Sequence, residues 1–178
     1  MAHALQLQEI TQELLDQAIS EWEQQLAEHD DVNPARSRGA LARCKDILDG
    51  HHDLQYCYAY VGPTGSIDGL VLLSHACPNS AKPWLKVLEL TLAPAFVDSD
   101  NPAPLDDLIQ MAGTVVSEVF ELSSDKHKSE SVKIYGDSIM DVRIWKSVAQ
   151  KLRRNSEVQM PFDATSHGRW LVLTRNGR

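Results

Sequence analysis

Several features that identify particular classes of protein are missing from this sequence of 178 residues. No apolar stretch approaches the ~20 residues that a membrane-spanning helix needs. The chain does not open with a basic segment followed by an apolar one, so we expect no secretion signal and no membrane partner. The glycine-rich fingerprints of nucleotide-binding folds are also missing, because Gly62-Pro63-Thr64-Gly65 lacks the third glycine and precedes a predicted strand. Without repeats or linkers, residues 1–178 are predicted to form a single domain.

Cysteine is scarce and its spacing is uninformative. Cys44, Cys57 and Cys77 are odd in number, widely separated and without a CxxC pair. This pattern argues against a disulfide framework and against a zinc site, and it favours a reducing, cytoplasmic location. The run from His51 to Asp53 lacks the further ligands that a metal ion needs, so a solvated loop is the simpler interpretation and no metal is expected.

Basic residues are few in most of the chain. The net charge is −8 and the sequence pI is near 5.3. Residues 1–124 hold 6 Lys and Arg against 19 Asp and Glu, whereas residues 125–178 hold 11 against 6. General nucleic-acid binding needs a basic surface, so we expect no nucleic-acid partner. The basic C-terminal third suits an acidic partner or a phosphate group, although a solvated helix face is the simpler and favoured explanation.

The hydrophobic pattern predicts an alternation of helices and strands. Thr11 and Asn33-Pro34 are good N-caps for two successive helices, and Gly50 is a suitable stop for the second. The expected order is strand, two helices, three strands, helix, strand, helix, two strands. The segments are a strand at Leu5 and Leu7, helices 11–30 and 33–50, strands 54–61, 67–74 and 87–94, a helix 105–120, a strand 132–135, a helix capped by Asp137 or Ser138, and strands at 158–160 and 170–173.

The segment from Trp84 to Phe120 is the most informative. The apolar run Val87–Pro94 predicts a buried strand, and an acidic, proline-bearing loop follows it over 98–104. The longest amphipathic pattern in the chain then begins at Leu105. Strand, loop and helix N-terminus together make an arrangement that binds anions and cofactors, because unpaired backbone N–H groups and the helix dipole point out of the loop.

The element order and three local stretches resemble the GNAT superfamily of N-acyltransferases. The stretches are Ala59–Leu70, which is similar to that family's second hairpin, Leu88–Pro94, which is similar to its fourth strand, and Tyr135–Leu152, which is similar to its fifth strand and following helix. The resemblance implies an α+β fold with a mixed, mostly antiparallel sheet of six to seven strands and helices on both faces. It covers nearly the whole chain.

The resemblance also implies a function. Acetyl-CoA or another acyl-CoA is the expected co-substrate, lying along the fourth strand at Leu90, Thr91 and Leu92, and a small-molecule or peptide amine is the acceptor. Glu89 takes the place of the base that removes a proton from the amine, because an ammonium has no lone pair with which to attack. The family's usual acidic tyrosine aligns with Trp145, so Tyr135 or Ser138 is the candidate that protonates the leaving thiolate. A homodimer is compatible with this family.

The loop after the fourth strand departs from the family pattern. It lacks the glycines and basic residues that usually cradle the diphosphate of CoA, and Pro102 and Pro104 each remove an N–H donor. Asp98 and Asp100 bring negative charge, and acids in the first helical turn, Asp106 and Asp107, satisfy the helix dipole by themselves. Two alternatives follow: a GNAT-like protein without catalysis that binds a protein or small ligand, and an acidic secretion-chaperone-like dimer, whose usual element order differs. Glu89 itself is explained equally well as a sheet-face carboxylate satisfied by a neighbouring cation or hydroxyl.

Overall fold

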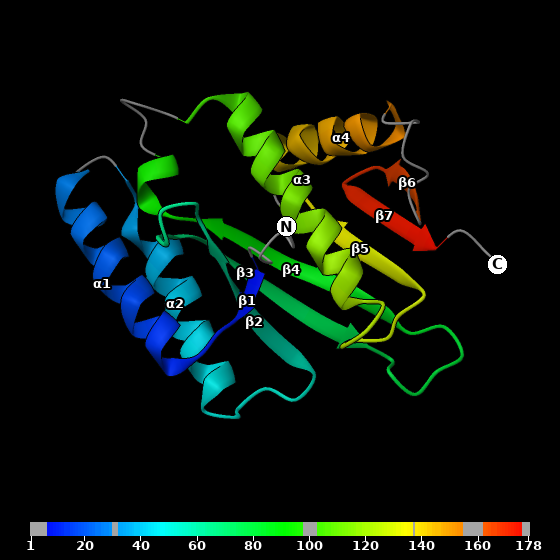
Figure 1. Ribbon diagram of the computed structural model, residues 1–178, viewed down its shortest axis with the longest axis horizontal. Helices are drawn as coiled ribbons and strands as arrows, with labels where there is room; N and C mark the ends of the chain where they lie inside the picture. The colour runs from blue at the N-terminus through cyan, green and yellow to red at the C-terminus, as the bar shows by residue number, and fades with distance from the viewer. Residues whose placement is uncertain (1–6, 30–31, 98–102, 137, 155–161, 176–178) are drawn as a thin grey trace. The chain divides into compact units, whose positions relative to one another are not determined.

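The computed structural model describes residues 7–29, 32–97, 103–136, 138–154 and 162–175 (Figure 1). The element order agrees with the one predicted from the sequence, with one short 3-10 helix, η1, added after the central strand. The elements are β1 (Leu7–Glu9), α1 (Gln12–Glu28), α2 (Pro34–Leu48), β2 (Gln55–Val61), β3 (Ile67–Ala76), β4 (Trp84–Leu92), η1 (Pro94–Phe96), α3 (Leu105–Leu122), β5 (Ser131–Tyr135), α4 (Ile139–Arg154), β6 (Phe162–His167) and β7 (Trp170–Arg175).

The strands form one mixed sheet in the order β1-β2-β3-β4-β5-β7-β6. β1 pairs with β2, β5 with β7 and β6 with β7, all antiparallel, whereas β4 and β5 run parallel. The predicted α+β class with a mostly antiparallel sheet is therefore confirmed, and the sheet has seven strands. Contacts divide the chain into two compact units, which are described separately below. A single domain over 1–178 stays a prediction.

The first unit consists of residues 1–73 and 89–104. Its core is an apolar cluster in which side chains of α1 and α2 meet those of β2 and β3, including the fully buried Trp22 and Ile67. Trp22 also donates a hydrogen bond of 2.7 Å from Nε1 to the carbonyl of Ile67, which satisfies the one polar atom of its side chain. The predicted caps are confirmed: Thr11 Oγ1 accepts from Leu14 N, and Asn33 Oδ1 accepts from Ala35 N.

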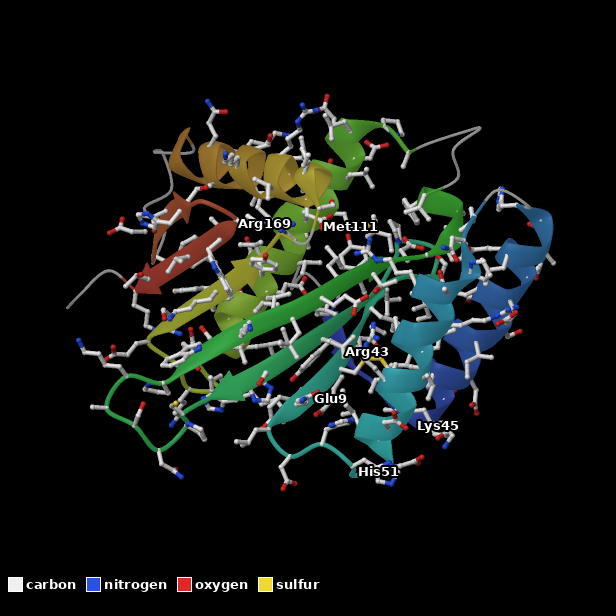
Figure 2. All side chains as sticks on the ribbon, turned by 180° about the vertical axis from the view of Figure 1, so that it is seen from behind. Glu9, Arg43, Lys45, His51, Met111 and Arg169 are labelled. Atoms are coloured by element: carbon white, nitrogen blue, oxygen red, sulfur yellow. A yellow bond between two sulfur atoms is a disulfide. The ribbon has the colours of Figure 1, made fainter. Side chains whose placement is uncertain are left out.

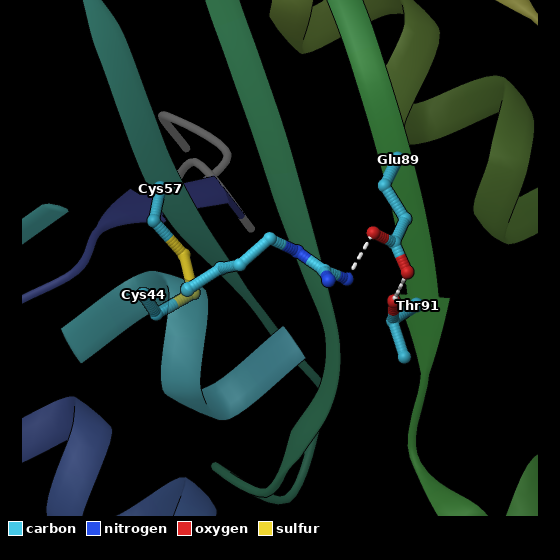
Figure 3. Close-up of a disulfide and its surroundings, with 5 residues drawn as sticks. Cys44, Cys57, Glu89 and Thr91 are labelled. Atoms are coloured by element: carbon cyan, nitrogen blue, oxygen red, sulfur yellow. Dashed lines mark hydrogen bonds and ion pairs between the residues drawn. A yellow bond between two sulfur atoms is a disulfide. The ribbon is translucent and has the colours of Figure 1, made fainter. Parts of the chain in front are cut away.

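A disulfide joins α2 to β2 in this unit. Cys44 and Cys57 are bonded, and both residues are buried (Figure 3). The sequence-based prediction that the cysteines form no disulfide is therefore wrong. Cys44 lies on the apolar face of α2, and Cys57 lies on β2. The packing of α2 on β2 brings the two residues together, although their spacing in the sequence does not indicate a pair. The cysteine argument for a reducing compartment no longer holds, and Cys77 is the free cysteine.

The second unit consists of residues 74–88 and 105–178. α3 buries one apolar face that includes Val115, Val116 and Val119, as its periodicity predicts. α4 starts with a reciprocal cap: Asp141 N donates to Ser138 Oγ at 3.0 Å, and Ser138 N donates to Asp141 Oδ2 at 2.9 Å. Of the two predicted caps, Ser138 is confirmed, and Asp137 lies outside the described residues.

The C-terminal hairpin differs from the prediction. The strand expected at 158–160 lies outside the described residues, and the structure has a strand that was not predicted, β6, at Phe162–His167. Gly168 adopts a positive φ of 58° in the tight turn that connects β6 to β7. Within the described part of the chain, no helix is long and apolar enough to cross a bilayer.

Candidate functional site

The residues predicted for catalysis and co-substrate binding are divided between the two units. Glu89, Leu90, Thr91 and Leu92 lie on the last part of β4, in the first unit. Tyr135 and Ser138 lie at the end of β5 and at the start of α4, in the second unit.

Glu89 and Thr91 lie two residues apart on β4 and therefore project from the same face of the strand. Thr91 Oγ1 donates a hydrogen bond of 2.7 Å to Glu89 Oε1 (Figure 3). Thr91 is buried, with 1% of its surface exposed, whereas 23% of the Glu89 side chain remains accessible. The structure thus brings two of the predicted residues into direct contact, with the carboxylate at the solvent boundary.

Two arginines of α2 point at the same carboxylate. Arg43 Nη2 donates to Glu89 Oε2, and Arg36 Nε lies 3.9 Å from Glu89 Oε1. Figure 2 shows Arg43 on the side of α2 that faces the strands. Both oxygens of Glu89 are therefore engaged, one by Arg43 and one by Thr91. This arrangement is what we expect if Glu89 is a structural carboxylate satisfied by its neighbours. If Glu89 accepts a proton from a substrate, the contact with Arg43 or the contact with Thr91 must first break.

The end of β4 carries the backbone groups that are predicted to hold the pantetheine arm. The register of β4 with β5 ends at the pair Val87–Ile134, although β4 continues to Leu92. In the first unit, the Leu90 carbonyl accepts a hydrogen bond of 3.3 Å from Arg36 Nη2. Leu90 and Leu92 are partly exposed, whereas Thr91 is buried. The Leu90 carbonyl, which is predicted to pair with the pantetheine arm, thus accepts a hydrogen bond from the exposed Arg36 side chain.

The two candidate acids of the second unit occupy different surroundings. The Tyr135 ring lies 4.9 Å from the Trp170 ring, centroid to centroid, and 5.0 Å from the Arg169 guanidinium carbon. Ser138 Oγ caps α4, as described above. Tyr135 presents a half-buried phenol beside a cation, and Ser138 presents an exposed hydroxyl already used by the helix. No hydrogen bond joins these two side chains within the described residues, and their role stays a prediction.

Trp145 is a further residue of interest in α4. It is 6% exposed, and its Nε1 is the one buried side-chain donor of the described residues that has no hydrogen-bond partner. The resemblance aligns this residue with the family's acidic tyrosine. An indole N–H donates a hydrogen bond but does not give up its proton to a thiolate.

The start of α3 has the acidic character that the sequence predicted. Asp106 and Asp107 lie in its first turn, and Asp106 is almost fully exposed at 91%. Lys151 of α4 approaches Asp106 at 3.9 Å. The predicted loop residues Asp98, Asp100 and Pro102 lie outside the described residues. The first turn of α3 therefore suits a cation or water better than a dianionic diphosphate.

Sequence reasoning missed the two arginines and the disulfide. Arg36 and Arg43 are separated by seven residues, so they lie two turns apart on the same face of α2, and this spacing was the available signal. Nothing in the sequence indicated that this face meets Glu89, 46 residues beyond Arg43. No group of three His, Cys, Asp or Glu side chains suitable for a metal ion occurs among the described residues.

No family model and no curated protein matches the sequence. Similar solved structures include a GNAT family acetyltransferase from Brucella melitensis in complex with acetyl-CoA, with 11% identity, a TM-score of 0.48 and coverage of 98% of this chain and 90% of that one. A chimeric spermidine N-acetyltransferase from Vibrio cholerae has 12% identity, a TM-score of 0.48 and coverage of 95% and 92%.

An acetyltransferase from Agrobacterium tumefaciens is similar at 10% identity and a TM-score of 0.46, with coverage of 96% of this chain and 90% of that one. The α+β assignment rests on the chain's own element order and strand order.

Proposed function

We propose that this protein is an acyl-CoA-dependent N-acyltransferase that moves an acetyl group to an amine. The observation that carries the proposal is the end of β4, which continues for five residues past its last pair with β5 and presents Glu89 at the solvent boundary. Backbone N–H and C=O groups in this segment suit the amides of a pantetheine arm, which pair with a strand as another strand does. A carboxylate beside them suits the deprotonation of an amine.

The reaction assigns a role to each residue. Glu89 accepts a proton from the substrate ammonium, and the amine nitrogen then forms a bond to the thioester carbonyl carbon. The C–S bond breaks, the nitrogen gives up its second proton, and the thiolate takes up one proton. Glu89 returns its proton to water, so one proton is released overall. A backbone N–H of β4 near Leu90 to Leu92 stabilises the oxyanion. Tyr135 or Ser138 supplies the proton for the thiolate.

A second candidate function is a non-catalytic protein that has kept this fold and binds a protein or small ligand. Two observations favour it. Glu89 is paired with Arg43 and Thr91, and α3 opens with Asp106 and Asp107. These features describe a satisfied structural carboxylate and a helix start that repels phosphate.

Calorimetric titration with acetyl-CoA, followed by a thiol-release assay with a panel of amines, separates the two candidates. The enzyme binds acetyl-CoA and releases thiol faster when an amine is present. The same measurements on the Asp98→Asn/Asp100→Asn variant test whether the acidic loop limits affinity. If neither protein binds acetyl-CoA, the acyltransferase proposal fails and the binding protein remains.

A further inference from the structure

The basic residues of the first unit are distributed in an unusual way. Residues 1–73 and 89–104 contain 15 acidic and four basic residues, and all four basic residues lie on α2. Arg38 forms a two-bond pair with Glu23, at 2.8 and 2.7 Å, and this hydrogen bonding lowers the pKa of the Glu23 carboxyl. Lys45 pairs with Asp49 at 2.7 Å. Each of these two cations thus has a carboxylate of its own.

Arg36 and Arg43 differ, because they share one carboxylate. Glu89 is the acidic partner of both, so the three side chains together carry one uncompensated positive charge. Two guanidinium groups hold ten N–H donors. The bonds described above use one donor of Arg43, to Glu89, and one of Arg36, to Leu90. With 55% and 46% of their side chains exposed, both arginines are accessible to a solute.

Helix stability does not explain Arg36. It occupies the first turn of α2, which has no acidic residue. A cation at this end opposes the helix dipole and costs about 0.3–1 kcal/mol in an exposed first turn. Its guanidinium points instead to β4, where it reaches the Leu90 carbonyl. Arginine suits a site that recognises a carboxylate, because its planar fork matches the two oxygens.

We propose that Arg36, Arg43 and Glu89 form the acceptor site, and that the acceptor is an amino acid with a free carboxylate next to its amino group. The substrate carboxylate binds the two arginines and the ammonium binds Glu89, so adjacent opposite charges on the protein meet adjacent opposite charges on the zwitterion. The catalytic meaning of this site rests on the proposed acyltransferase function, but its ligand class does not.

This assignment also explains how a paired Glu89 serves as a base. When the substrate carboxylate takes over Arg43, the Glu89 oxygen that Arg43 held becomes free to accept the ammonium proton. Thr91 keeps the carboxylate in place through its other oxygen, at 2.7 Å. The exchange replaces one arginine–carboxylate pair by another, so no charge is left without a partner.

Nuclear magnetic resonance tests the site directly. The standard amino acids and the amides of the same amino acids are titrated into ¹⁵N-labelled protein, and the Nε–H signals of Arg36 and Arg43 are followed. At least one amino acid is expected to shift both signals and to bind tenfold or more tightly than its amide. In the Arg36→Gln/Arg43→Gln variant the ratio of the two Kd values should fall below about threefold. A tenfold ratio corresponds to ~1.4 kcal/mol, so most of this difference in binding free energy would be lost.

Arg38→Gln is the matched control, because Arg38 lies on the same helix but pairs with Glu23. Arg38→Gln should keep the preference for the amino acid over its amide. If the double variant is poorly folded, Arg36→Lys replaces it in the test; this variant retains the charge and should keep part of the preference. A preference that survives in the double variant, or no amino acid that binds better than its amide, overturns the inference. Thiol release separates the two proposals: binding of amino acids without turnover contradicts the acyltransferase, and turnover of amines irrespective of a carboxylate contradicts this site.

Discussion

Glu89 is the residue on which the proposed chemistry depends, and a change of one atom tests it. Glu89→Gln keeps the size of the side chain and an oxygen that accepts from Thr91, but it removes the base. We expect kcat/KM for acyl transfer to fall about 10²–10⁴-fold, the usual contribution of a positioned base. The free energy of unfolding should fall by no more than about 1 kcal/mol, since Arg43 is half exposed and can turn to water.

Glu23→Gln is a suitable control for this change. It removes a carboxylate that pairs with Arg38 of α2, the helix that also carries Arg43, and it leaves β4 untouched. It should leave turnover within threefold of the unmodified protein. If Glu89→Gln also leaves turnover within threefold, Glu89 is a structural partner of Arg43 and the base lies elsewhere.

Asp68 makes the free energy of unfolding depend on pH, and the surroundings of its carboxyl determine the sign of this dependence. Burial raises the pKa of this carboxyl above 3.8, against the opposing hydrogen bond of 2.6 Å that Ser66 Oγ donates, and the nearby Glu21 raises it further. An acid whose pKa is higher in the folded state stabilises the fold below its unfolded pKa, and this contribution is lost as the pH rises through the folded pKa. Asp68 therefore favours unfolding near neutrality.

The Asp68→Asn variant removes this ionisation and keeps an oxygen that accepts from Ser66. Its urea midpoint, relative to that of the unmodified protein, should be higher at pH 7 than at pH 4. Ser66→Ala removes the opposing hydrogen bond and should steepen the loss of stability with rising pH. A constant difference between Asp68→Asn and the unmodified protein over this pH range would contradict the assignment.

At the scale of elements, the disulfide fixes α2 on β2 directly beside the functional arginine. Cys44 follows Arg43 in the chain, and the bond closes a loop with a sequence separation of 13. A crosslink of this length stabilises a fold by about 3 kcal/mol, chiefly by restricting the unfolded chain. The Cys44→Ala/Cys57→Ala variant should therefore lose about 2–4 kcal/mol of unfolding free energy, measured by urea denaturation.

Cys77→Ala is the control, because Cys77 is exposed and unpaired, and it should change the midpoint little. Dithiothreitol should lower the midpoint of the unmodified protein and leave that of the double variant unchanged. Alkylation of the native protein should modify one thiol. Modification of three thiols in the folded protein, with an unchanged midpoint, would show that the bond is not formed.

The elements also show how far the sequence alone could lead. The caps at Thr11, Asn33 and Ser138 were predictable because a cap and the N–H group it satisfies are two or three residues apart. Of the two strands that flank the Gly168 turn, β7 was predicted at 170–173. β6 was not, since it is short and polar and the apolar pair at 158–160 led the prediction to another segment. Element type followed from periodicity, and the end of each element from local chemistry.

The site was less predictable than the fold, for a physical reason. Glu89 and Thr91 could be paired from the alternation of a strand, because both project from one face. Arg43 is 46 residues from Glu89, and the contact exists only because α2 packs against β2, from where the Arg43 side chain reaches Glu89 on β4. The disulfide depends on the same packing. Contacts between elements follow from tertiary structure, which periodicity does not encode.

At the scale of the whole molecule, the distribution of charge predicts which part of acyl-CoA contributes to binding. The diphosphate usually gains charge-assisted hydrogen bonds, worth ~1.5–3 kcal/mol each. Here the first turn of α3 carries Asp106 and Asp107, which already complement the helix dipole. We therefore expect acetyl-pantetheine, which lacks the nucleotide and the diphosphate, to bind within about threefold of acetyl-CoA.

Thermal shift measurements at matched concentrations test this expectation, because a ligand that binds only the folded state stabilises it by RT ln(1 + [L]/Kd). The Asp106→Asn/Asp107→Asn variant should bind acetyl-CoA more tightly and acetyl-pantetheine with unchanged affinity, since neutral side chains no longer repel the diphosphate. Glu118→Gln, which changes an acid near the other end of the same helix, should alter neither affinity. If acetyl-CoA binds more than tenfold tighter than acetyl-pantetheine, basic side chains hold its diphosphate, and the acidic start of α3 is not where it lies.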